Sequence, residues 1–376
     1  MTTTPHQQLV NTKRWVIKIG SALLTKVGEG LDRDRIRWLT EEIAFLRQQG
    51  KEVVLVTSGS VAAGMQELGW SQRPHALHQL QAAASVGQMG LIQAYASECK
   101  KHDIHTAQIL LTHSDLSDRG RYLNARSALH TLLELGVLPV VNENDTIATE
   151  EIRFGDNDTL AAMTANLVEA EVLVILTDQD GLFDSDPRNN PDARMIAASA
   201  ATNPALDEMA GEGTGSLGRG GMATKLLAAR RAARSGAVTV ILSGKKPENL
   251  RYLADGAAVG TLLWPDDEPM TARQQWLLAQ QVKGRITLDD GAVSAIRQQG
   301  RSVLHVGVKL VEGEFSRGEM VVCCDAAGKE VARGLVNYNS DESNHLMGHS
   351  SAEIEVLLGY VDEPELINRD NLVVTS

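Results

Sequence analysis

Short, continuously apolar runs alternate with helical patterns from residue 15 to about residue 263. The run at 15–19 predicts a buried strand, and the apolar positions that follow it at 36, 39, 43 and 46 fall on one face of a helix. We expect further strands at 53–57, 106–112, 137–141, 172–177 and 237–242, with helices at 76–101, 119–135, 157–169 and 222–234. Apolar strands that alternate with helices are typical of a parallel sheet covered on both faces. Ligands of such sheets bind beyond the carboxyl ends of the strands.

The pattern changes after Trp264, where a polar, proline-bounded stretch at 265–269 interrupts the alternation. A short helix with Trp276 and Leu277 is expected next. From Lys283 onward, short strands are separated by glycine turns, and we expect them at 301–306, 320–324, 330–336 and 353–358, with a hairpin loop at 325–328. The sequence therefore predicts an α/β domain at 1–265, a linker at 266–282 and a small, mostly β domain at 283–376.

Composition excludes several classes of partner. The chain has 376 residues, and 43% of them are hydrophobic, which suits two folded domains with a sizeable core. Its formal net charge of −12 argues against bulk attraction to nucleic acid or to anionic membranes. The aromatic content of 4% makes a large base-stacking platform unexpected.

The cysteines and the N-terminal sequence predict a cytoplasmic protein. Cys99, Cys323 and Cys324 are too few for a disulfide framework and lack metal-ligand spacing. The first residues show no basic segment followed by an apolar core, so no signal peptide is expected. A run of about 18 apolar residues, which a membrane-spanning helix would need, is not found either. We expect no association with a membrane.

Two strand ends in the first half of the chain suggest an anion site. Lys18 comes late in a buried strand and is followed by Gly20, so its ammonium group would lie beside free backbone N–H groups. A lysine that only extends from the sheet edge would look the same. Ser58 follows the next strand in a Thr-Ser-Gly-Ser turn that leads into a helix, although it would also serve as an ordinary helix cap. This turn is not a Walker motif, because no lysine follows its glycine.

Acids and amides gather after the strand at 137–141. Asn142, Glu143, Asn144 and Asp145 follow it directly, and a second group surrounds Gly155 at 153–158. Loops and helix caps favour these residue types anyway. Their density nevertheless indicates a site for a substrate ammonium group and a carboxylate that orients lysines.

A glycine-rich segment at 211–221 ends at a helix that carries Lys225 in its first turn. Gly213–Gly218 matches the dinucleotide pattern GxGxxG, but that fingerprint must follow a strand, and a helical pattern at 205–210 precedes it here. We interpret the segment as a loop whose backbone approaches phosphates. Thr177 and Asp178 end another strand and would hold the base or ribose of a nucleotide, although a turn accounts for them equally well.

In order and spacing, these segments resemble the amino acid kinase family. The matching stretches lie at 15–21, 54–64, 140–145, 154–160, 176–183 and 213–225, and the region at 313–334 resembles a PUA domain. The resemblance covers most of the chain, and no key position departs from the pattern. It implies a three-layer αβα sandwich on a mostly parallel sheet, followed by a small PUA-like barrel. It further implies phosphorylation of the γ-carboxylate of L-glutamate by ATP.

Carried over residue by residue, the resemblance assigns roles to the positions above. Lys18 and Lys225 would neutralise the transferring phosphoryl group, and Asp158 would hold both lysines. Ser58, Asp145 and Asn157 would bind glutamate. ATP would be bound by Lys18, Thr177, Asp178, Arg219, Gly220, Gly221, Met222, Ala223, Thr224 and Lys225.

The resemblance also implies partners and regulation. Members of the family need Mg²⁺, and the sequence does not identify its protein ligands. The product, L-glutamyl 5-phosphate, starts proline biosynthesis, and proline would act as an inhibitor at the glutamate site. A homo-oligomer, either dimer or tetramer, is expected, with possible handover of the product to a glutamyl phosphate reductase.

The acceptor chemistry fits the residues. A carboxylate with a pKa of about 4.3 is already ionised at neutral pH, so no general base is needed. Acetylglutamate lacks the free ammonium that the acidic residues would bind, and a nucleoside monophosphate would require more arginines. Carbamate, an acceptor of another kinase of this family, stays an alternative. Aspartate remains open, since one methylene group discriminates by only about 1–3 kcal/mol.

RNA binding is the alternative from a different class, because PUA domains elsewhere bind RNA. Residues 283–376 contain three Lys, six Arg and fifteen Asp or Glu, a net charge of −6. RNA-binding surfaces are generally basic. We therefore expect a structural or regulatory role for this domain.

Overall fold

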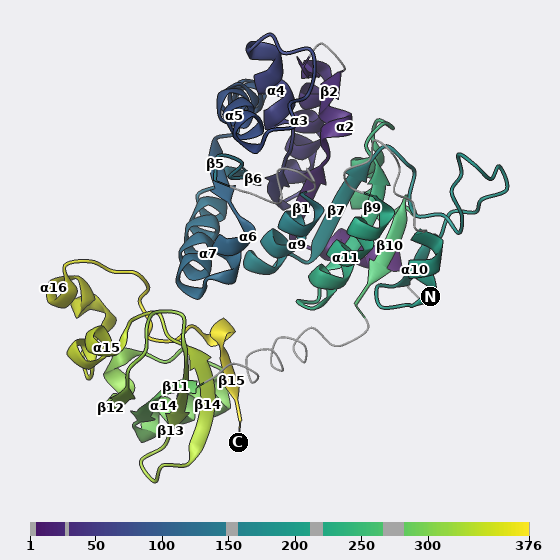
Figure 1. Cartoon of the computed structure of the whole chain (residues 1–376). Helices are drawn as coiled ribbons and strands as arrows, with labels where there is room; N and C mark the ends of the chain where they lie inside the picture. The colour runs from purple at the N-terminus through teal and green to yellow at the C-terminus, as the bar shows by residue number, and fades with distance from the viewer. Residues whose placement is uncertain (1–4, 27–29, 148–156, 211–220, 266–281, 376) are drawn as a thin grey trace. The chain divides into compact units, whose positions relative to one another are not determined.

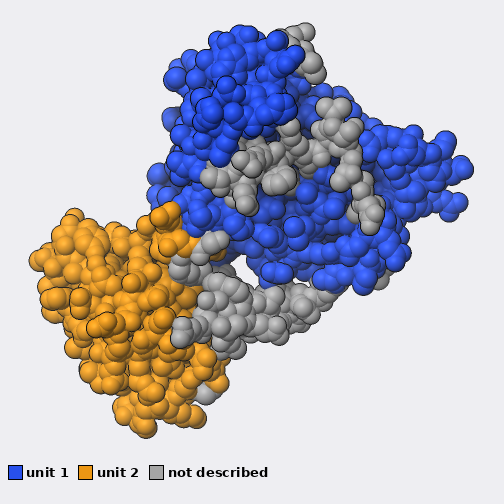
Figure 2. Space-filling view, in the orientation of Figure 1, with its two compact units in different colours: residues 1–116, 125–269 blue, residues 117–124, 270–376 orange. Residues whose placement is uncertain are grey.

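The computed structural model describes residues 5–26, 30–147, 157–210, 221–265 and 282–375. They divide into two compact units, coloured separately in Figure 2. Unit 1 comprises residues 1–116 and 125–269, and unit 2 comprises residues 117–124 and 270–376. No helix in the described part of the chain is long and apolar enough to cross a membrane.

Unit 1 is built on an eight-stranded sheet with the order β5-β6-β4-β1-β7-β9-β10-β8 (Figure 1). Six strands, from β5 to β9 in this order, run parallel, and β10 is antiparallel to β9. The strands are β1 Arg14–Ile19, β4 Glu52–Val56, β5 Thr106–Leu111, β6 Leu138–Glu143, β7 Val172–Thr177, β8 Ala198–Ala200, β9 Val238–Ser243 and β10 Thr261–Trp264. A separate two-stranded hairpin pairs β2 Thr25–Lys26 with β3 Gly30–Leu31.

Helices cover both faces of this sheet. Alternate residues of β1, such as Trp15 and Ile17, share a core with the apolar stripe of α3 Arg33–Gln48 and with α5 Leu77–Lys100. The opposite face carries α9 Asp158–Leu167 and α11 Met222–Ala233, which Figure 1 shows in front of β1, β7 and β9. The other helices are α1 Pro5–Gln8, α2 Ser21–Leu24, α4 Ser60–Glu67, α6 His113–Ser117, α7 Arg119–Glu134, α10 Ala205–Ala210 and α12 Asn249–Ala254, with a 3₁₀ turn at Leu9–Asn11.

The expected strands and helices of unit 1 are confirmed to within two residues at each end. The pattern of apolar residues predicted these strands well, because strands that are buried on both faces consist of continuous apolar runs. The hairpin β2–β3 and the strands β8 and β10 were not predicted, since strands of two to four residues show no measurable periodicity. The mostly parallel sheet with helices on both faces is confirmed as well.

Unit 2 contains a five-stranded mixed sheet with the order β12-β11-β13-β14-β15. Its elements are β11 Val282–Leu288, α14 Asp290–Gln299, β12 Val308–Gly313, β13 Met320–Cys324, β14 Glu330–Leu335, α15 Ser340–Leu346, α16 Ile354–Leu358 and β15 Leu372–Val374, with 3₁₀ turns at His305–Gly307, Ser351–Glu353 and Arg369–Asn371. The predicted hairpin at 325–328 joins β13 to β14, and Gly328 has a φ of 79° there. One core of apolar side chains lies under this sheet.

Two predicted strands of unit 2 are wrong. At 301–306 only Val303 forms an isolated bridge, to Ile367, and the chain then enters a 3₁₀ turn. At 353–358 the chain is helical, because Ser350 and Glu353 form a capping box that starts a helical turn. The helix expected around Trp276 lies outside the described residues.

Candidate functional site

Three buried charged side chains meet at the carboxyl end of the central strand. Nζ of Lys18 lies 2.5 Å from Oδ1 of Asp158, and Nζ of Lys225 lies 3.0 Å from Oδ2 of the same carboxylate. Asp158 is completely buried, and Lys18 and Lys225 are only 4% and 6% exposed. One carboxylate therefore holds two ammonium groups in place.

Each member of this cluster is placed by a different element. Lys18 is the penultimate residue of β1, between its parallel neighbours β4 and β7. Asp158 opens α9, and Lys225 lies in the first turn of α11, so two helix N-termini point toward the same place. Helix N-termini favour negative charge. Thr224 donates a hydrogen bond to Oδ2 of Asp158 at 3.1 Å, which adds a neutral partner.

The electrostatics of Asp158 fit this role. Burial alone would raise the pKa of the Asp158 carboxyl group, but Lys18 and Lys225 outweigh burial and hold that pKa well below its usual range. Asp158 is therefore ionised at neutral pH. Two buried ammonium groups beside two helix N-termini make this place suited to an anion such as a phosphate.

A network of amides lies beside the cluster. Asn157 donates hydrogen bonds from Nδ2 to the carbonyl oxygen of Thr57 at 2.6 Å and to Oδ1 of Asn142 at 2.9 Å. Nδ2 of Asn142 in turn donates to Oε1 of Gln88 at 2.7 Å. These bonds connect the end of β4, the end of β6, helix α5 and the start of α9 in one rigid arrangement.

Ser58 and Asp145 lie at the same edge of the sheet. Ser58 is buried, and it does not cap helix α4, since the N-cap is Gly59 with no side-chain cap bond. Oγ of Ser60 donates to Oδ2 of Asp145 at 2.7 Å. Burial raises the pKa of Asp145, while the Ser60 hydrogen bond and the charge of Arg73 act in the opposite direction. Ser60 and Arg73 were not singled out in the sequence.

The turn at Ser58 is supported by a close helix crossing that the sequence did not reveal. A Cβ atom at Gly87 would lie 2.0 Å from the carbonyl oxygen of Ser60, and one at Gly64 would lie 1.7 Å from the carbonyl oxygen of Ala83. Only glycine therefore permits α4 and α5 to cross at this distance. The two glycines are 23 residues apart, and a single sequence does not show that they face one another.

A second group of polar residues follows β7 and β9. Oγ1 of Thr177 donates to Asp178 at 3.3 Å, and Asp178 lies 3.8 Å from Nζ of Lys245. Nζ of Lys246 lies 2.7 Å from Asp180. Thr177 and Asp178 were predicted here, whereas Lys245 and Lys246 were missed. Two lysines that follow a buried strand and a single glycine were a usable signal for an anion site.

The glycine-rich segment is only partly described. Arg219 and Gly220 lie outside the described residues, as do Arg153 to Asp156. Gly221 is the N-cap of α11, Met222 packs into the apolar cluster beneath it, and Ala223 is exposed. Within the described ranges, no group of three His, Cys, Asp or Glu side chains is arranged to hold a metal ion.

Comparisons with known proteins identify the family of the chain. The profile of the amino acid kinase family matches residues 13–243, and that of the PUA domain matches residues 284–358. A glutamate 5-kinase of Nitrosococcus oceani is 64% identical over 370 residues, which are 98% of this chain and 99% of that protein. A glutamate 5-kinase of Thioalkalivibrio sulfidiphilus is 61% identical over 373 residues, 99% and 100% of the two chains.

Similarity to solved structures is more remote. The UMP kinase of Bacillus anthracis has a TM-score of 0.49 and 18% sequence identity, over 68% of this chain and 97% of that chain. This level of similarity supports no argument about activity. The family assignment depends instead on the profile match and on the two relatives of nearly full length.

Proposed function

The chain belongs to the amino acid kinase family, and from this premise we propose that it transfers the γ-phosphoryl group of ATP to the side-chain carboxylate of L-glutamate. The two glutamate 5-kinases that cover almost the whole chain support this assignment. The structural observation that carries it is the buried carboxylate of Asp158 between Lys18 and Lys225. The product is L-glutamyl 5-phosphate, the first intermediate of proline biosynthesis.

The reaction brings two anions together and requires no proton transfer. The γ-carboxylate of glutamate is ionised at neutral pH, since its pKa is about 4.3. Phosphoryl transfer then depends on alignment and on neutralising the charge of the γ-phosphate.

Lys18 and Lys225 supply the neutralising charge. Their ammonium groups lie on either side of Asp158, which fixes their positions before the substrates bind. Preorganised cations in a buried site stabilise developing charge without reorganisation during the reaction. Asp158 is thus a positioning residue, and it contacts the lysines without being required to touch the substrate.

Glutamate would bind along the edge formed by the ends of β4 and β6. Asp145 is suited to the α-ammonium group, while Ser58 and Asn157 provide a hydroxyl group and an amide nearby. Arg73, half-buried and electrostatically linked to Asp145, is a further candidate for this pocket. Acetylglutamate has no free ammonium group, so recognition of this group by Asp145 would disfavour acetylglutamate as the acceptor.

ATP would bind along the edge formed by β7, β9 and the start of α11. Thr177 and Asp178 would hold the base or ribose, and the segment from Arg219 to Lys225 would bind the phosphates. Mg²⁺ would arrive with the phosphates of ATP and neutralise part of their charge. Lys18 and Lys225 complete the phosphate site from the protein side.

The domain limits, the inhibitor, the oligomeric state and the fate of the product are proposed from the family in the same way. Residues 1–265 would form the catalytic domain, 266–282 a linker and 283–376 the PUA domain. Proline would inhibit by occupying the glutamate site, the chain would form a dimer or tetramer, and the labile product would pass to a glutamyl phosphate reductase. All three cysteines are free and buried, which suits the reducing cytoplasm.

The proposal is tested by measuring ADP release from MgATP with glutamate, aspartate or acetylglutamate as the acceptor. Release that depends on glutamate supports it. Release that depends on another acceptor would leave the proposed roles of Lys18 and Lys225 unchanged, but the substrate pocket would then belong to that acceptor. The absence of release with every acceptor would reject the proposed activity.

A further inference from the structure

One buried N–H donor beside the ends of β4 and β6 has no hydrogen-bond partner. Gln88 of α5 is half-buried, its Nε2 atom is fully buried, and no atom among the described residues accepts a hydrogen bond from Nε2. A buried donor without an acceptor costs free energy, so a ligand or an ordered water molecule is needed to explain it. The activity proposed above gives this donor no role.

The orientation of the Gln88 amide is fixed from the other end of its hydrogen-bonded network. The carbonyl oxygen of Thr57 can only accept, so the atom of Asn157 that lies 2.6 Å from it is Nδ2. The same Nδ2 lies 2.9 Å from Asn142, where the acceptor is therefore Oδ1. Asn142 then directs its own Nδ2 to Gln88 at 2.7 Å, and the accepting atom is Oε1. The network therefore ends in a free donor, Nε2 of Gln88.

This network extends from one end of the proposed glutamate site to the other. Asn157 directly precedes the carboxylate that holds the two lysines, so this end lies where the phosphoryl group would be transferred. At the other end, a Cβ atom at Gly87 would lie 2.0 Å from the carbonyl oxygen of Ser60. The hydroxyl group of Ser60 donates to Asp145. Gln88, the residue after Gly87, therefore lies on the side proposed for the α-ammonium group.

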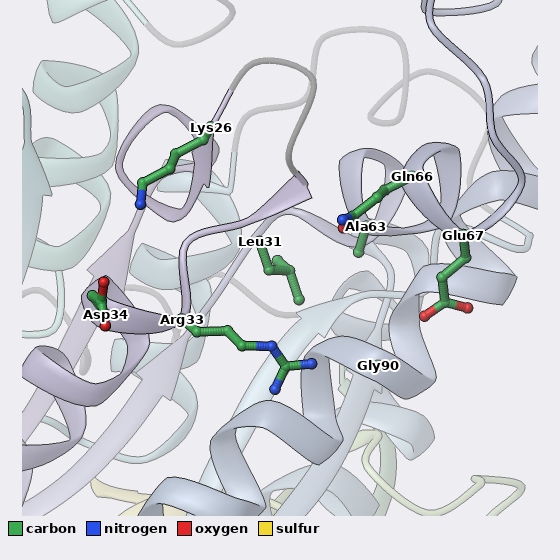
Figure 3. Close-up of a pocket in the computed structure, with 8 residues that line it drawn as sticks. All are labelled: Lys26, Leu31, Arg33, Asp34, Ala63, Gln66, Glu67 and Gly90. Carbon is green, nitrogen blue, oxygen red and sulfur yellow. The ribbon is translucent and has the colours of Figure 1, made fainter.

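Gln88 faces away from the cavity that α4 and α5 border elsewhere. This cavity of about 340 Å³ is lined by Glu67 and Gly90, among other residues (Figure 3). Two positions along an α-helix differ in direction by about 200°, so Gln88 and Gly90 lie on opposite sides of α5. The free donor therefore belongs to the sheet edge that carries Asn142.

We propose that Nε2 of Gln88 donates a hydrogen bond to the α-carboxylate of glutamate and thereby selects acceptors that carry this group; the role rests on the proposed phosphorylation of glutamate. A hydrogen bond to a carboxylate is stronger than one between neutral groups. With Asp145 at the α-ammonium group, both charged groups on the α-carbon would be recognised. The γ-carboxylate would then extend toward Lys18 and Lys225, and the side chain of aspartate would be one methylene group too short.

The test compares glutamate with its α-amide, which keeps the γ-carboxylate and has a neutral carboxamide in place of the α-carboxylate. Calorimetric titration at pH 8 gives the Kd of both compounds for the wild type, Gln88→Met, Gln88→Glu and Gln93→Met. Gln88→Met removes the donor and the acceptor, whereas Gln88→Glu keeps an oxygen atom for Asn142 and has no N–H group. Gln93 is exposed on the same helix and is the control. ADP release from MgATP gives kcat for glutamate.

The Kd for glutamate should rise at least about tenfold in Gln88→Met and in Gln88→Glu, as for loss of a hydrogen bond to a charged group, with little change in kcat. The Kd for the α-amide should change much less in Gln88→Met. In Gln88→Glu it should fall, because the new carboxylate can accept a hydrogen bond from the carboxamide. Gln93→Met should bind both compounds like the wild type.

A residue that only supports Asn142, with its donor bound to water, would give a different result. Gln88→Glu would then bind glutamate like the wild type, or both compounds would lose affinity by the same factor, and either outcome would overturn the proposal. Glutamate-dependent ADP release by the wild type with unchanged Kd values in the Gln88 variants would reject this role alone. No such release by the wild type would reject the proposed activity and, with it, the role of Gln88.

Discussion

Oδ1 of Asp158 lies 2.5 Å from Nζ of Lys18, and both groups are buried at the end of the central strand β1. A buried ion pair seldom adds stability compared with apolar residues of the same size. The proposed catalytic role would explain its presence here, because the second oxygen of the same carboxylate holds Lys225. The pair fixes a cation at the place where the transferred phosphoryl group would lie.

Replacing Lys225 by alanine should lower kcat at least about a hundredfold, as expected when one donor to a transition state is lost. Steady-state ADP release measures the effect. Lys100→Ala, which removes an exposed lysine at the end of α5, is the control and should leave kcat unchanged. Near-normal turnover of Lys225→Ala would contradict the role assigned to this residue.

Replacing Asp158 by asparagine should destabilise unit 1 and impair activity together. The change removes the carboxylate that both buried ammonium groups contact, and breaking a buried ion pair in this way costs about 3–5 kcal/mol. Denaturant unfolding provides the measurement, and Asp186→Asn, at an exposed ion pair with Arg188, serves as the control. Equal midpoints for the two variants would show that Asp158 does not hold the lysines.

Asp145→Asn should raise the KM for glutamate about ten- to a hundredfold, as for loss of one charged hydrogen bond, with little change in the KM for ATP. Asp178→Asn should raise the KM for ATP and leave the KM for glutamate nearly unchanged, because Asp178 lies at the proposed nucleotide edge. Initial rates with each substrate varied separately distinguish the two. If both variants changed the same KM, the division of the site into two edges would be wrong.

Gly87→Ala should weaken both stability and glutamate binding. The new methyl group would lie 2.0 Å from the carbonyl oxygen of Ser60, so the backbone at Ser60 would have to move. Because the hydroxyl group of Ser60 donates a hydrogen bond to Asp145, this movement would also disturb Asp145. Gly90→Ala in the same helix meets only the mobile end of Glu67 and is the control for stability. Thermal unfolding of the two variants provides the comparison, and a similar Tm for both would contradict the close crossing of α4 and α5.

The stability of unit 2 should depend on pH through His305. This side chain is fully buried, neither ring nitrogen has a hydrogen-bond partner among the described residues, and burial lowers its pKa to about 4. The unfolded chain binds a proton below about pH 6.5, so stability is complete above that pH. Stability then falls as the pH drops from 6.5 toward 4, by roughly 3 kcal/mol in total.

The variant His305→Leu isolates this contribution, because leucine cannot take up a proton. Thermal unfolding followed by circular dichroism at pH 7 and pH 4.5 should show a smaller loss of Tm in the variant than in the wild type. Carboxylates titrate in both proteins, and their effect therefore cancels in the comparison. An equal loss in both would show that His305 is not the group responsible.

The sequence predicted the large sheet because its strands have a strong apolar signal and its helices a regular period. It also indicated Lys18, near the end of a strand that leads into Gly20, and Lys225, in the first turn of a helix that follows a glycine-rich segment. Their convergence on Asp158 was implied only by the family resemblance, since a contact between residues so far apart is decided by the topology of the sheet.

Other features left no local signal. The contact of Gly64 and Gly87 depends on how α4 crosses α5, and the hydrogen bond from Ser60 to Asp145 joins residues 85 positions apart. In unit 2, apolar residues at 353–358 predicted a strand, and the capping box at Ser350 produced a helix. Local hydrogen bonds of side chains therefore outweighed the pattern of apolar residues at that position.

Trapping of the acyl phosphate tests the central claim most directly. The protein is incubated with MgATP, hydroxylamine and one acceptor, and the hydroxamate formed from the trapped acyl phosphate is measured by its colour. The account predicts hydroxamate with glutamate, none with acetylglutamate, and at least about a hundredfold less with the Lys225→Ala variant. Absence of hydroxamate with glutamate, under conditions in which ATP is bound, would contradict it.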